Sequence, residues 1–513
     1  IDIEGIADRI LALPVGPGFY SSLSAGPEKQ IYFKGNPAFP PAEGPATSKL
    51  HVFSLESRKD NVALDALNNY QLSFDKSKIL YNLADNWFIT KTGDKIEPGK
   101  GGLNLDAAQI KIDPPAEWAQ MFNDVWRINR DYFYDPGMHG ADWNAMKKKY
   151  QQFIPYLTCR DDFTRLTRWM CSELSVGHSY TWGGEQYRTA KTVPVGLLGA
   201  DYNVENNLYR FSKIYGGLNW TPELRSPLTE PGVNVKEGDY LLAVNGQEVK
   251  APASIYSFFD NTAGKLVEIK VSSKADGSDA RIVQVVPVAN EMDLRNRYWV
   301  ENNLKKVTEV TQGRVAYVYV PNTSTAGHDY FKRYFFPQSD RDAIIIDERF
   351  NGGGSLADYI VDILRRPYLN YWATRYGEDI KAPNAAITGP KVMLINEFAG
   401  SGGDYLPWSF KKLNLGTLVG TRTWGGLVGI LNFPPLMDGG VVTAPNVAFW
   451  NEDGWRIENE GIAPDIEIEQ LPADVAAGKD PQLDKAIQLV MDQLKTNPPK
   501  KPVRPAYPVR VRK

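Results

Sequence analysis

The sequence contains little cysteine and little histidine. It has 2 cysteines, Cys159 and Cys171, and 4 histidines among 513 residues. Two cysteines exclude a disulfide-stapled scaffold. The histidines lie far apart and none stands in a spacing typical of zinc ligands, so we expect no metal site and no cofactor.

An excess of charge and long apolar runs are also missing. Lys+Arg 58 against Asp+Glu 61 leaves a net charge of −3, which excludes binding to nucleic acid by overall charge. No apolar run approaches the ~18 residues of a membrane-spanning helix, so we expect a soluble chain without a membrane span. Because the first residue is Ile rather than Met, we expect a processed or truncated chain, from which an export signal could have been lost upstream.

What is present is enough apolar sequence for about three or four globular domains. Residues 1–105 predict a β-rich region, because HVFSLES, YQLSFDKSKILYNL and NWFIT alternate around Asn, Asp and Gly. Residues 114–188 predict a helical domain. Its first helix carries an apolar stripe at the spacing i, i+3, i+4, i+7, made by Trp118, Met121, Phe122 and Val125.

Residues 190–290 return to strand patterns, with Asn245-Gly246 as a hairpin turn. The run VKEGDYLLAVNGQEV resembles the PDZ domains. In that family the backbone N–H groups of a short loop bind the carboxylate of a peptide, and here this position holds Gly196, Leu197, Leu198 and Gly199. The alternative is a domain that serves only as a spacer.

Residues 291–470 predict an α/β domain, because short β-branched runs alternate with helical stretches. The expected buried strands are GRVAYVYVP, DAIIIDE, KVMLIN and TLVGTRT. Residues 471–513 predict a short helix and a basic, proline-rich tail that cannot pack into a core.

Three loops of the sequence are candidates for chemistry. Ser401 follows the strand KVMLIN and precedes a helix, where free N–H groups favour a developing anion; it is either a nucleophile or a helix N-cap. The triple glycine 352–354 follows another buried strand and is either an oxyanion loop or a plain turn. His178, after a predicted helix end, is either a general base or a surface filler.

Five sequence motifs contain or follow these loops. In chain order they are GHSY, NGGG, EFAGSGGD, GTRTWGGLVG and ENEGIAPDIEIE. Together they resemble the tricorn proteases, a family within the wider group of C-terminal-processing serine peptidases. The resemblance covers nearly the whole of this chain, which corresponds to the C-terminal half of a tricorn protease. It implies a multidomain α+β and α/β fold with these parts: a β-propeller remnant at 1–105, a helical domain at 114–188, a PDZ-like β domain at 190–290, a crotonase-like α/β catalytic domain at 291–470, and a C-terminal helix and tail at 471–513.

The resemblance also implies roles for single residues. Ser401 corresponds to the nucleophile, His178 to its general base and Glu458 to the carboxylate that orients the imidazole. Four glycines correspond to the oxyanion hole (Gly354, Gly402) and the substrate groove (Gly352, Gly353). One branch of the wider group uses a lysine base downstream of the serine, but no lysine occurs from residue 413 to 478, which favours the histidine branch.

The sequence departs from the family pattern at three positions. Gly177 stands where a supporting hydroxyl is common, and Ser179 is the candidate replacement. Gly402 stands where tricorn has an acid. Trp372 stands where tricorn has the acid that selects basic side chains, and because a neutral indole cannot pair with Lys or Arg we expect an apolar or aromatic preference.

The resemblance implies a serine peptidase that hydrolyses oligopeptides through an acyl-enzyme. It further implies a homo-oligomer, a hexamer in the archetype, and an N-terminal propeller fragment or chain as a partner. Tricorn is intracellular, whereas exported relatives make the periplasm the alternative location. The alternative function is a PDZ-like peptide-binding scaffold with an inactive peptidase domain. An esterase is less favoured because no G-x-S-x-G motif surrounds Ser401.

Overall fold

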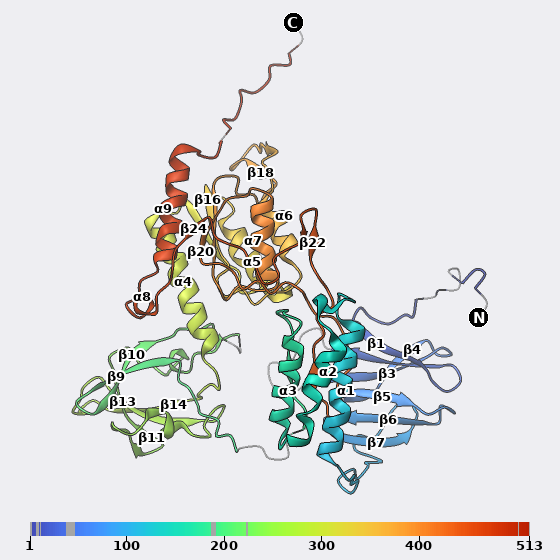
Figure 1. The fold of residues 1–513 in the computed structure, drawn as a ribbon. Helices are drawn as coiled ribbons and strands as arrows, with labels where there is room; N and C mark the ends of the chain where they lie inside the picture. The colour runs from blue at the N-terminus through green and yellow to red at the C-terminus, as the bar shows by residue number, and fades with distance from the viewer. Residues whose placement is uncertain are drawn as a thin grey trace. The chain divides into compact units, whose positions relative to one another are not determined.

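The chain divides into two compact units, residues 1–112 and 113–513 (Figure 1). The computed structural model describes residues 3–6, 10, 12–36, 47–185, 191–221, 224–500 and 502–511. The expected domain boundary at 188–190 and the two outermost domain limits, 1 and 513, lie outside the described residues.

The first unit consists of two antiparallel sheets, one with the strand order β1-β2-β3-β4 and one with the order β5-β6-β7. Side chains from both sheets share one apolar core, which includes Tyr32, Val52, Leu67 and Tyr81. The strands expected at HVFSLES, YQLSFDKSKILYNL and NWFIT are present as β3, β5 with β6, and β7. The bounds are β1 Phe19–Ala25, β2 Gln30–Asn36, β3 Ser48–Ser54, β4 Lys59–Leu67, β5 Asn69–Leu72, β6 Lys78–Leu83 and β7 Asn86–Lys91.

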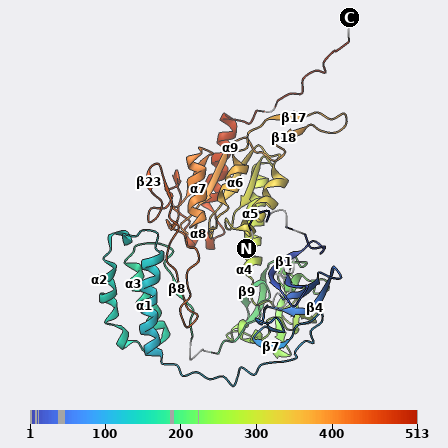
Figure 2. The ribbon, with the colours of Figure 1, turned by 90° about the vertical axis from the view of Figure 1, so that its right-hand side faces the viewer.

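The second unit begins with three helices that pack together (Figure 2). They are α1 Pro114–Tyr132, α2 Trp143–Gln151 and α3 Arg160–Ser172, with short 3-10 turns η2 Met138–Gly140 and η3 Ile154–Tyr156 between them. Helix α1 starts where predicted, because Asp113 accepts a hydrogen bond from the Ala116 N–H and proline at the first helical position needs no partner. The predicted stripe is buried, with Trp118 6% exposed and Phe122 fully buried.

A six-stranded antiparallel sheet follows, in the order β14-β13-β11-β10-β9 with β12 paired to β11. The predicted hairpin turn joins β11 to β12, and Asn245 (φ 47°) and Gly246 (φ 79°) both take the positive φ that a type I′ turn requires. The bounds are β9 Ala200–Glu205, β10 Leu208–Ile214, η5 Pro227–Thr229, β11 Tyr240–Val244, β12 Gln247–Glu248, η6 Ile255–Phe259, β13 Val267–Ser272 and β14 Arg281–Val285.

The last large element is a five-stranded parallel sheet in the order β15-β16-β19-β20-β24. The four predicted buried runs form β15, β16, β19 and β20. The strand bounds are β15 Val315–Tyr319, β16 Ala343–Asp347, β19 Lys391–Ile395, β20 Thr417–Gly420 and β24 Ile466–Glu467. The helices are α4 Met292–Val310, α5 Thr325–Phe335, η7 Phe336–Gln338, α6 Ala357–Leu364, α7 Gly402–Lys412, α8 Pro472–Ala476 and α9 Pro481–Thr496.

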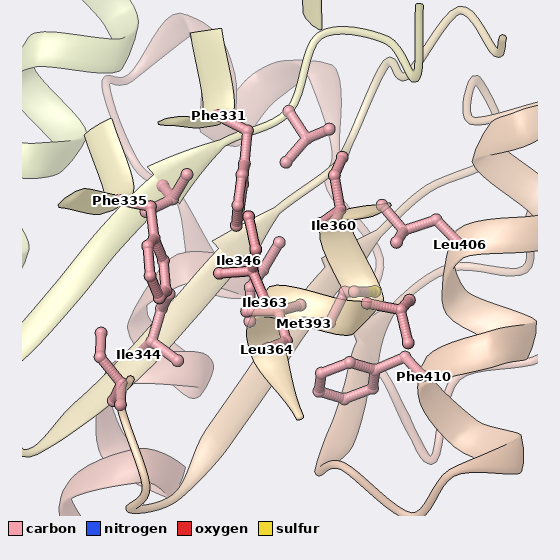
Figure 3. Packing of buried hydrophobic residues seen from close by; sticks show 14 of the residues in the cluster. Phe331, Phe335, Ile344, Ile346, Ile360, Ile363, Leu364, Met393, Leu406 and Phe410 are labelled. Atoms are coloured by element: carbon pink, nitrogen blue, oxygen red, sulfur yellow. The ribbon is translucent and has the colours of Figure 1, made fainter. Parts of the chain in front are cut away.

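Helices cover both faces of this sheet, which is why its strands are apolar throughout. On one face α5, α6 and α7 pack on the sheet through large side chains such as Phe331, Phe335 and Phe410 (Figure 3). On the other face Val300 and Val307 of α4 and Leu483 and Val490 of α9 form a second core. The fold is therefore a mixed α/β fold of several domains, in which α9 covers part of one face of the parallel sheet.

A later part of the chain returns to the three-helix region. Strand β8, Thr181–Trp182, pairs antiparallel with β21, Val441–Val442, although the two lie far apart in sequence. Leu436, Val442 and Ala444 enter the core of α1, α2 and α3. Arg160 and Asp438 form an ion pair with both side chains 4% exposed. This junction brings the loop that carries His178 to the parallel-sheet domain.

Two hairpins project from the parallel-sheet domain. They are β17 Asn370–Trp372 with β18 Ile380–Ala382, and β22 Trp450–Asn451 with β23 Gly454–Trp455. Beyond α9 the tail is largely exposed, and Arg504 bonds to Asp379 and to the Thr374 carbonyl near the β17–β18 hairpin. Within the described ranges no helix is both long and apolar enough to cross a membrane.

Candidate active site

Ser401 lies at the carboxyl-end edge of the parallel sheet, at the N-cap of α7. Helix α7 begins at Gly402, earlier than the stretch YLPWSFKKL that the sequence predicts, so the serine is directly at the positive end of the helix. Its backbone has φ 58° and ψ −116°, a conformation that costs a non-glycine residue energy and is concentrated at functional sites.

Asp404 fixes the backbone of this loop. One of its carboxylate oxygens accepts hydrogen bonds from the N–H groups of Ser401 (2.8 Å) and Gly426 (3.1 Å), and the other from the Gly425 N–H (2.8 Å) and the Thr423 hydroxyl (2.5 Å). Burial raises the pKa of Asp404, while these four donors lower it. Asp404 is not among the predicted site residues, although an acid three residues after a serine N-cap is the signature of a capping box.

The triple-glycine loop lies against Ser401. A Cβ added to Gly353 would stand 2.7 Å from the Ser401 Cβ, and one added to Gly402 would stand 2.2 Å from the Gly354 carbonyl oxygen. These close approaches exclude side chains at both glycines. The Gly353 N–H donates to the Asn351 side chain at 2.9 Å, whereas the N–H groups of Gly354 and Gly402 have no partner in the described part of the chain.

Two buried polar residues, Asn351 and Glu348, support the glycine loop. The Asn351 carbonyl accepts from the Gly400 N–H at 3.1 Å, and its side-chain amide donates to Glu348 at 3.1 Å. Glu348 is completely buried, and burial, with the nearby Asp404 and Asp347 carboxylates, raises its pKa well above the usual value. Through Asn351, these contacts tie the glycine loop to the serine loop.

His178 is held by backbone bonds to the β21 segment. The Thr443 hydroxyl donates to the His178 carbonyl and accepts from the Tyr180 N–H, both at 2.6 Å. The imidazole Nδ1 is buried and has no hydrogen-bond partner among the described residues. Burial lowers the pKa of His178, and the Glu458 carboxylate opposes that shift.

Glu458 reaches the histidine loop through the backbone rather than through the ring. One carboxylate oxygen accepts from the Gly177 N–H at 2.6 Å, and the other from the N–H groups of Leu427 and Val428 at 2.7 Å each. Among the described residues, no hydrogen bond joins Glu458 to the Nδ1 of the imidazole. The carboxylate instead acts on the ring by its charge.

The hydroxyl expected from Ser179 is also not available to His178. Burial raises the pKa of the Cys171 thiol to about 12, and side-chain hydrogen bonds with Ser179 and Asn129 oppose that shift. Both cysteines are free, and Cys171 is buried. No described side chain supplies the bond to Nδ1 that the residue at position 177 commonly provides in the family.

Trp424 links the two halves of the site. Its ring lies 5.2 Å from the His178 ring, between centroids. A Cβ added to Gly177 would stand 3.2 Å from one edge of the indole, and one added to Gly400 would stand 2.5 Å from another atom of it. The structure shows no hydrogen bond between the His178 ring and the Ser401 hydroxyl within the described residues; the indole lies against the chain next to each of them.

The other predicted binding residues lie elsewhere. Trp372 is on β17, with its side chain 65% exposed. In the PDZ-like domain the N–H groups of Gly196, Leu197 and Gly199 donate to the Phe259 carbonyl, the Val288 carbonyl and the Glu291 carboxylate. Among the described residues, only the Leu198 N–H of the four predicted donors has no partner. The loop therefore does not present the free set of donors that the sequence predicts.

Three further residues lie at the site without having been predicted from the sequence. Asn351, Thr443 and Trp424 have no role in the prediction, and each connects backbone segments that are far apart in the sequence. Among the described residues no group of three or more His, Cys, Asp or Glu side chains is arranged to hold a metal ion.

Comparison with known proteins gives three family matches. Residues 114–172 match the tricorn protease C1 domain, residues 196–290 the tricorn protease PDZ domain and residues 314–468 peptidase family S41. The last match contains Ser401, Glu458 and the triple glycine.

Similar proteins match nearly the whole chain. A tricorn protease homolog of Streptomyces coelicolor is 34% identical over 518 residues, covering 98% of this chain and 48% of the homolog. The tricorn protease of Thermoplasma acidophilum is 30% identical over 498 residues, covering 97% of this chain and 44% of that protein. A crystal structure of the tricorn protease superposes with a TM-score of 0.86 at 30% identity, covering 94% of this chain and 47% of that chain. The chain thus spans about half the length of the curated relatives that it matches, and along that length it carries tricorn protease domains and is similar to the tricorn proteases.

Proposed function

We propose that this chain carries the catalytic domain of a serine peptidase that hydrolyses oligopeptides through an acyl-enzyme at Ser401. The observation that carries the proposal is the strained serine at the start of α7, next to the N–H groups of Gly354 and Gly402, which find no partner among the described residues. A serine in this setting has donors for the negative charge that develops on a carbonyl oxygen under attack. Similarity to the tricorn proteases and the match to peptidase family S41 support the same assignment.

The proposed chemistry proceeds in two steps. In the first, the Ser401 hydroxyl oxygen attacks the peptide carbonyl and its proton passes to His178 Nε2, which then protonates the leaving amine. In the second, water attacks the acyl-enzyme with His178 again as base, and the acid product leaves with Ser401 restored. The N–H groups of Gly354 and Gly402 stabilise the oxyanion in both steps.

Burial of His178 suits the role of a base. Because burial lowers the pKa of His178, the ring is neutral at pH 7 and able to accept a proton. The Glu458 carboxylate favours the imidazolium that forms, and by accepting from the Gly177 N–H it fixes the backbone next to the ring. We propose that the imidazole and the hydroxyl come within hydrogen-bond distance when substrate occupies the site, since catalytic hydrogen bonds often tighten only in the substrate complex.

The finer description of the fold is also proposed by family resemblance. We assign the two sheets of the first unit to the end of a β-propeller and the parallel-sheet domain to the crotonase-like type, with the domain limits 1–105, 114–188, 190–290, 291–470 and 471–513. The two antiparallel sheets that share a core, and the alternation of parallel strands with helices, support these assignments. A peptide substrate, a homo-oligomer (a hexamer by resemblance), a propeller fragment or chain as partner, and a cytoplasmic location belong to the same proposal.

Labelling with a fluorophosphonate tests the central claim. We expect the wild-type chain to be labelled at Ser401, and both Ser401→Ala and His178→Ala to lose the label, because the nucleophile or its activating base is removed. The matched control is Ser355→Ala, an exposed serine in the neighbouring loop, which should label like the wild type. Digestion of a random peptide mixture should show cleavage that falls by roughly 10⁴-fold or more in Ser401→Ala.

One outcome would reject the proposal. If the wild-type chain neither labels nor cleaves peptides while it remains folded, the peptidase assignment fails. The scaffold alternative would then be the remaining function, although the paired N–H groups of the loop 196–199 weigh against peptide binding there.

A further inference from the structure

Two exposed phenylalanines lie beside the nucleophile loop. Phe350 follows β16 and Phe398 follows β19, the strands at the centre of the parallel sheet. Their side chains are 50% and 63% exposed, and the rings stack with centroids 5.6 Å apart and planes 21° from parallel. The pair therefore presents an aromatic surface to the solvent at the same edge of the sheet as Ser401.

The surrounding structure holds this pair in place. Phe350 has φ 66°, a left-handed conformation that is a true outlier for a bulky side chain and is kept only where its surroundings impose it. The Asn396 side-chain oxygen accepts from the Phe350 N–H at 2.9 Å and from the Phe398 N–H at 3.3 Å, and Asn396 itself is 5% exposed. Trp299 contacts the Phe350 ring edge-on, with centroids 6.1 Å apart.

The positions of the two rings in the chain tie them to the reacting groups. Phe398 is three residues before Ser401, and Phe350 is three residues before Gly353, whose backbone lies against Ser401. Three residues span at most about 10 to 11 Å of extended chain. A peptide held at Ser401 advances about 3.3 Å per residue, so a side chain within about three residues of the cleaved bond reaches the rings.

We propose that Phe350 and Phe398 form an apolar subsite that binds an apolar or aromatic side chain of the peptide substrate near the cleaved bond. This inference rests on the proposed function and is separate from the prediction for Trp372. The rings carry no hydrogen-bond donor and no charge, so they favour Leu, Met or Phe over Asp or Lys, and stacked rings accept a further aromatic ring edge-on or offset. Substrate is the proposed occupant, rather than a second protein, because the same two loops carry the nucleophile and the glycine next to it.

Cleavage of a randomised peptide mixture tests the subsite. For the wild type we expect one position near the cleaved bond to favour apolar residues by about tenfold or more, and for Phe398→Ala this preference should fall to about threefold or less. The matching change for one apolar peptide is a rise in KM with kcat nearly unchanged. Phe398→Leu should keep most of the preference, and Phe74→Ala, which removes a fully exposed phenylalanine of the first unit, should keep all of it.

The experiment separates this inference from the proposed function. Fluorophosphonate labelling of Ser401 should be the same in Phe398→Ala as in the wild type, because the ring takes no part in the proton transfer. If labelling and cleavage persist and the preference profile of Phe398→Ala equals that of the wild type, the subsite is rejected while the peptidase stands. A change of sedimentation coefficient with an unchanged profile would assign the rings to a subunit contact and also reject the subsite. Loss of labelling in the wild type would reject both.

Discussion

The two halves of the proposed site are built in different ways. Ser401 and the triple glycine belong to loops of one sheet, and buried side chains such as Asp404 and Asn351 bond to several backbone groups of these loops at once. The loop of His178 depends on one pair of two-residue strands, on Thr443 and on the carboxylate of Glu458. The loops of Ser401 and the triple glycine are therefore rigid because buried side chains of the same domain fix them, whereas the position of the His178 base depends on a few contacts between distant segments.

The largest effect should come from disturbing the rigid side. Gly402→Ala would place a Cβ 2.0 Å from the Thr323 hydroxyl oxygen and 2.2 Å from the Gly354 carbonyl oxygen, so the two loops must separate. We expect kcat for peptide cleavage to fall by about 10²- to 10³-fold, as when one oxyanion donor is lost. The control is Gly216→Ala in the PDZ-like domain, where an added Cβ would meet nothing within 4 Å and activity should stay near wild type. A kcat of Gly402→Ala within threefold of wild type would contradict the rigid description.

Disturbing the histidine side should cost less. Thr443→Val removes the hydroxyl that donates to the His178 carbonyl and leaves the Tyr180 N–H without that acceptor. An unpaired buried group costs about 1 to 3 kcal/mol, so we expect kcat to fall by about tenfold and the melting temperature to drop by a few degrees. Thr443→Ser keeps the hydroxyl and should therefore keep most of the wild-type kcat and melting temperature. Equal values for the valine and serine variants would show that the hydroxyl does not hold the loop.

A smaller effect should separate two substitutions at Gly177. Either Ala or Ser adds a Cβ 3.0 Å from the Gly426 Cα and 3.2 Å from a Glu458 oxygen, so both should lower the melting temperature to a similar extent. Only Ser also supplies a hydroxyl next to His178, whose Nδ1 lacks a partner in the described structure. We expect kcat of Gly177→Ser to exceed that of Gly177→Ala by about threefold, since one hydrogen bond is worth about 0.5 to 1.5 kcal/mol. If Ala proves equal or faster, the hydroxyl has no role here.

The smallest effect is a shift in the pH profile. Burial lowers the pKa of His178 below its usual value of 6.5, and the base is active only when neutral. The neutral form therefore persists to lower pH than for an exposed histidine, and the acid limb of kcat/KM, which reports the free enzyme, should have its midpoint below pH 6.5. A profile of kcat/KM between pH 4 and 8 measures this, and a midpoint at or above pH 6.5 would show that the ring is more solvated than the structure indicates.

The sequence predicted those features that depend on local patterns. The buried runs of β15, β16, β19 and β20 are continuous and β-branched. Asn245 and Gly246 both accept the positive φ that a type I′ hairpin turn requires. Ser401 was placed correctly between a strand and a helix because both elements are local.

Local patterns were less accurate at the ends of helices. The N-cap of α3 is Cys159, whose side chain makes no capping hydrogen bond, and Thr158 bonds to Asp162 at the start of the helix. Helix α3 also ends at Ser172, before Gly177, the residue that the sequence marks as its stop. Shifts of a few residues change which side chain meets which N–H group, and the hydrophobic spacing does not fix the ends of a helix.

The contacts that complete the site could not be predicted, because they join residues far apart in the sequence. Arg160 and Asp438 are separated by 278 positions, and Tyr180 and Thr443 by 263. Nothing in either segment alone indicates its partner. The strain at Phe350 is likewise imposed by Asn396, a residue 46 positions away.

The pairing of β8 with β21 has a consequence for synthesis of the protein in the cell. The core of α1, α2 and α3 needs Leu436, Val442 and Ala444, and next to the paired strands Tyr180 bonds to Thr443, 263 positions later in the chain. A ribosome that adds roughly 5 to 20 residues per second would reach the second segment about 10 to 50 seconds after the first. During that interval the nascent helices keep an incomplete apolar face, which makes this region a natural client for a chaperone.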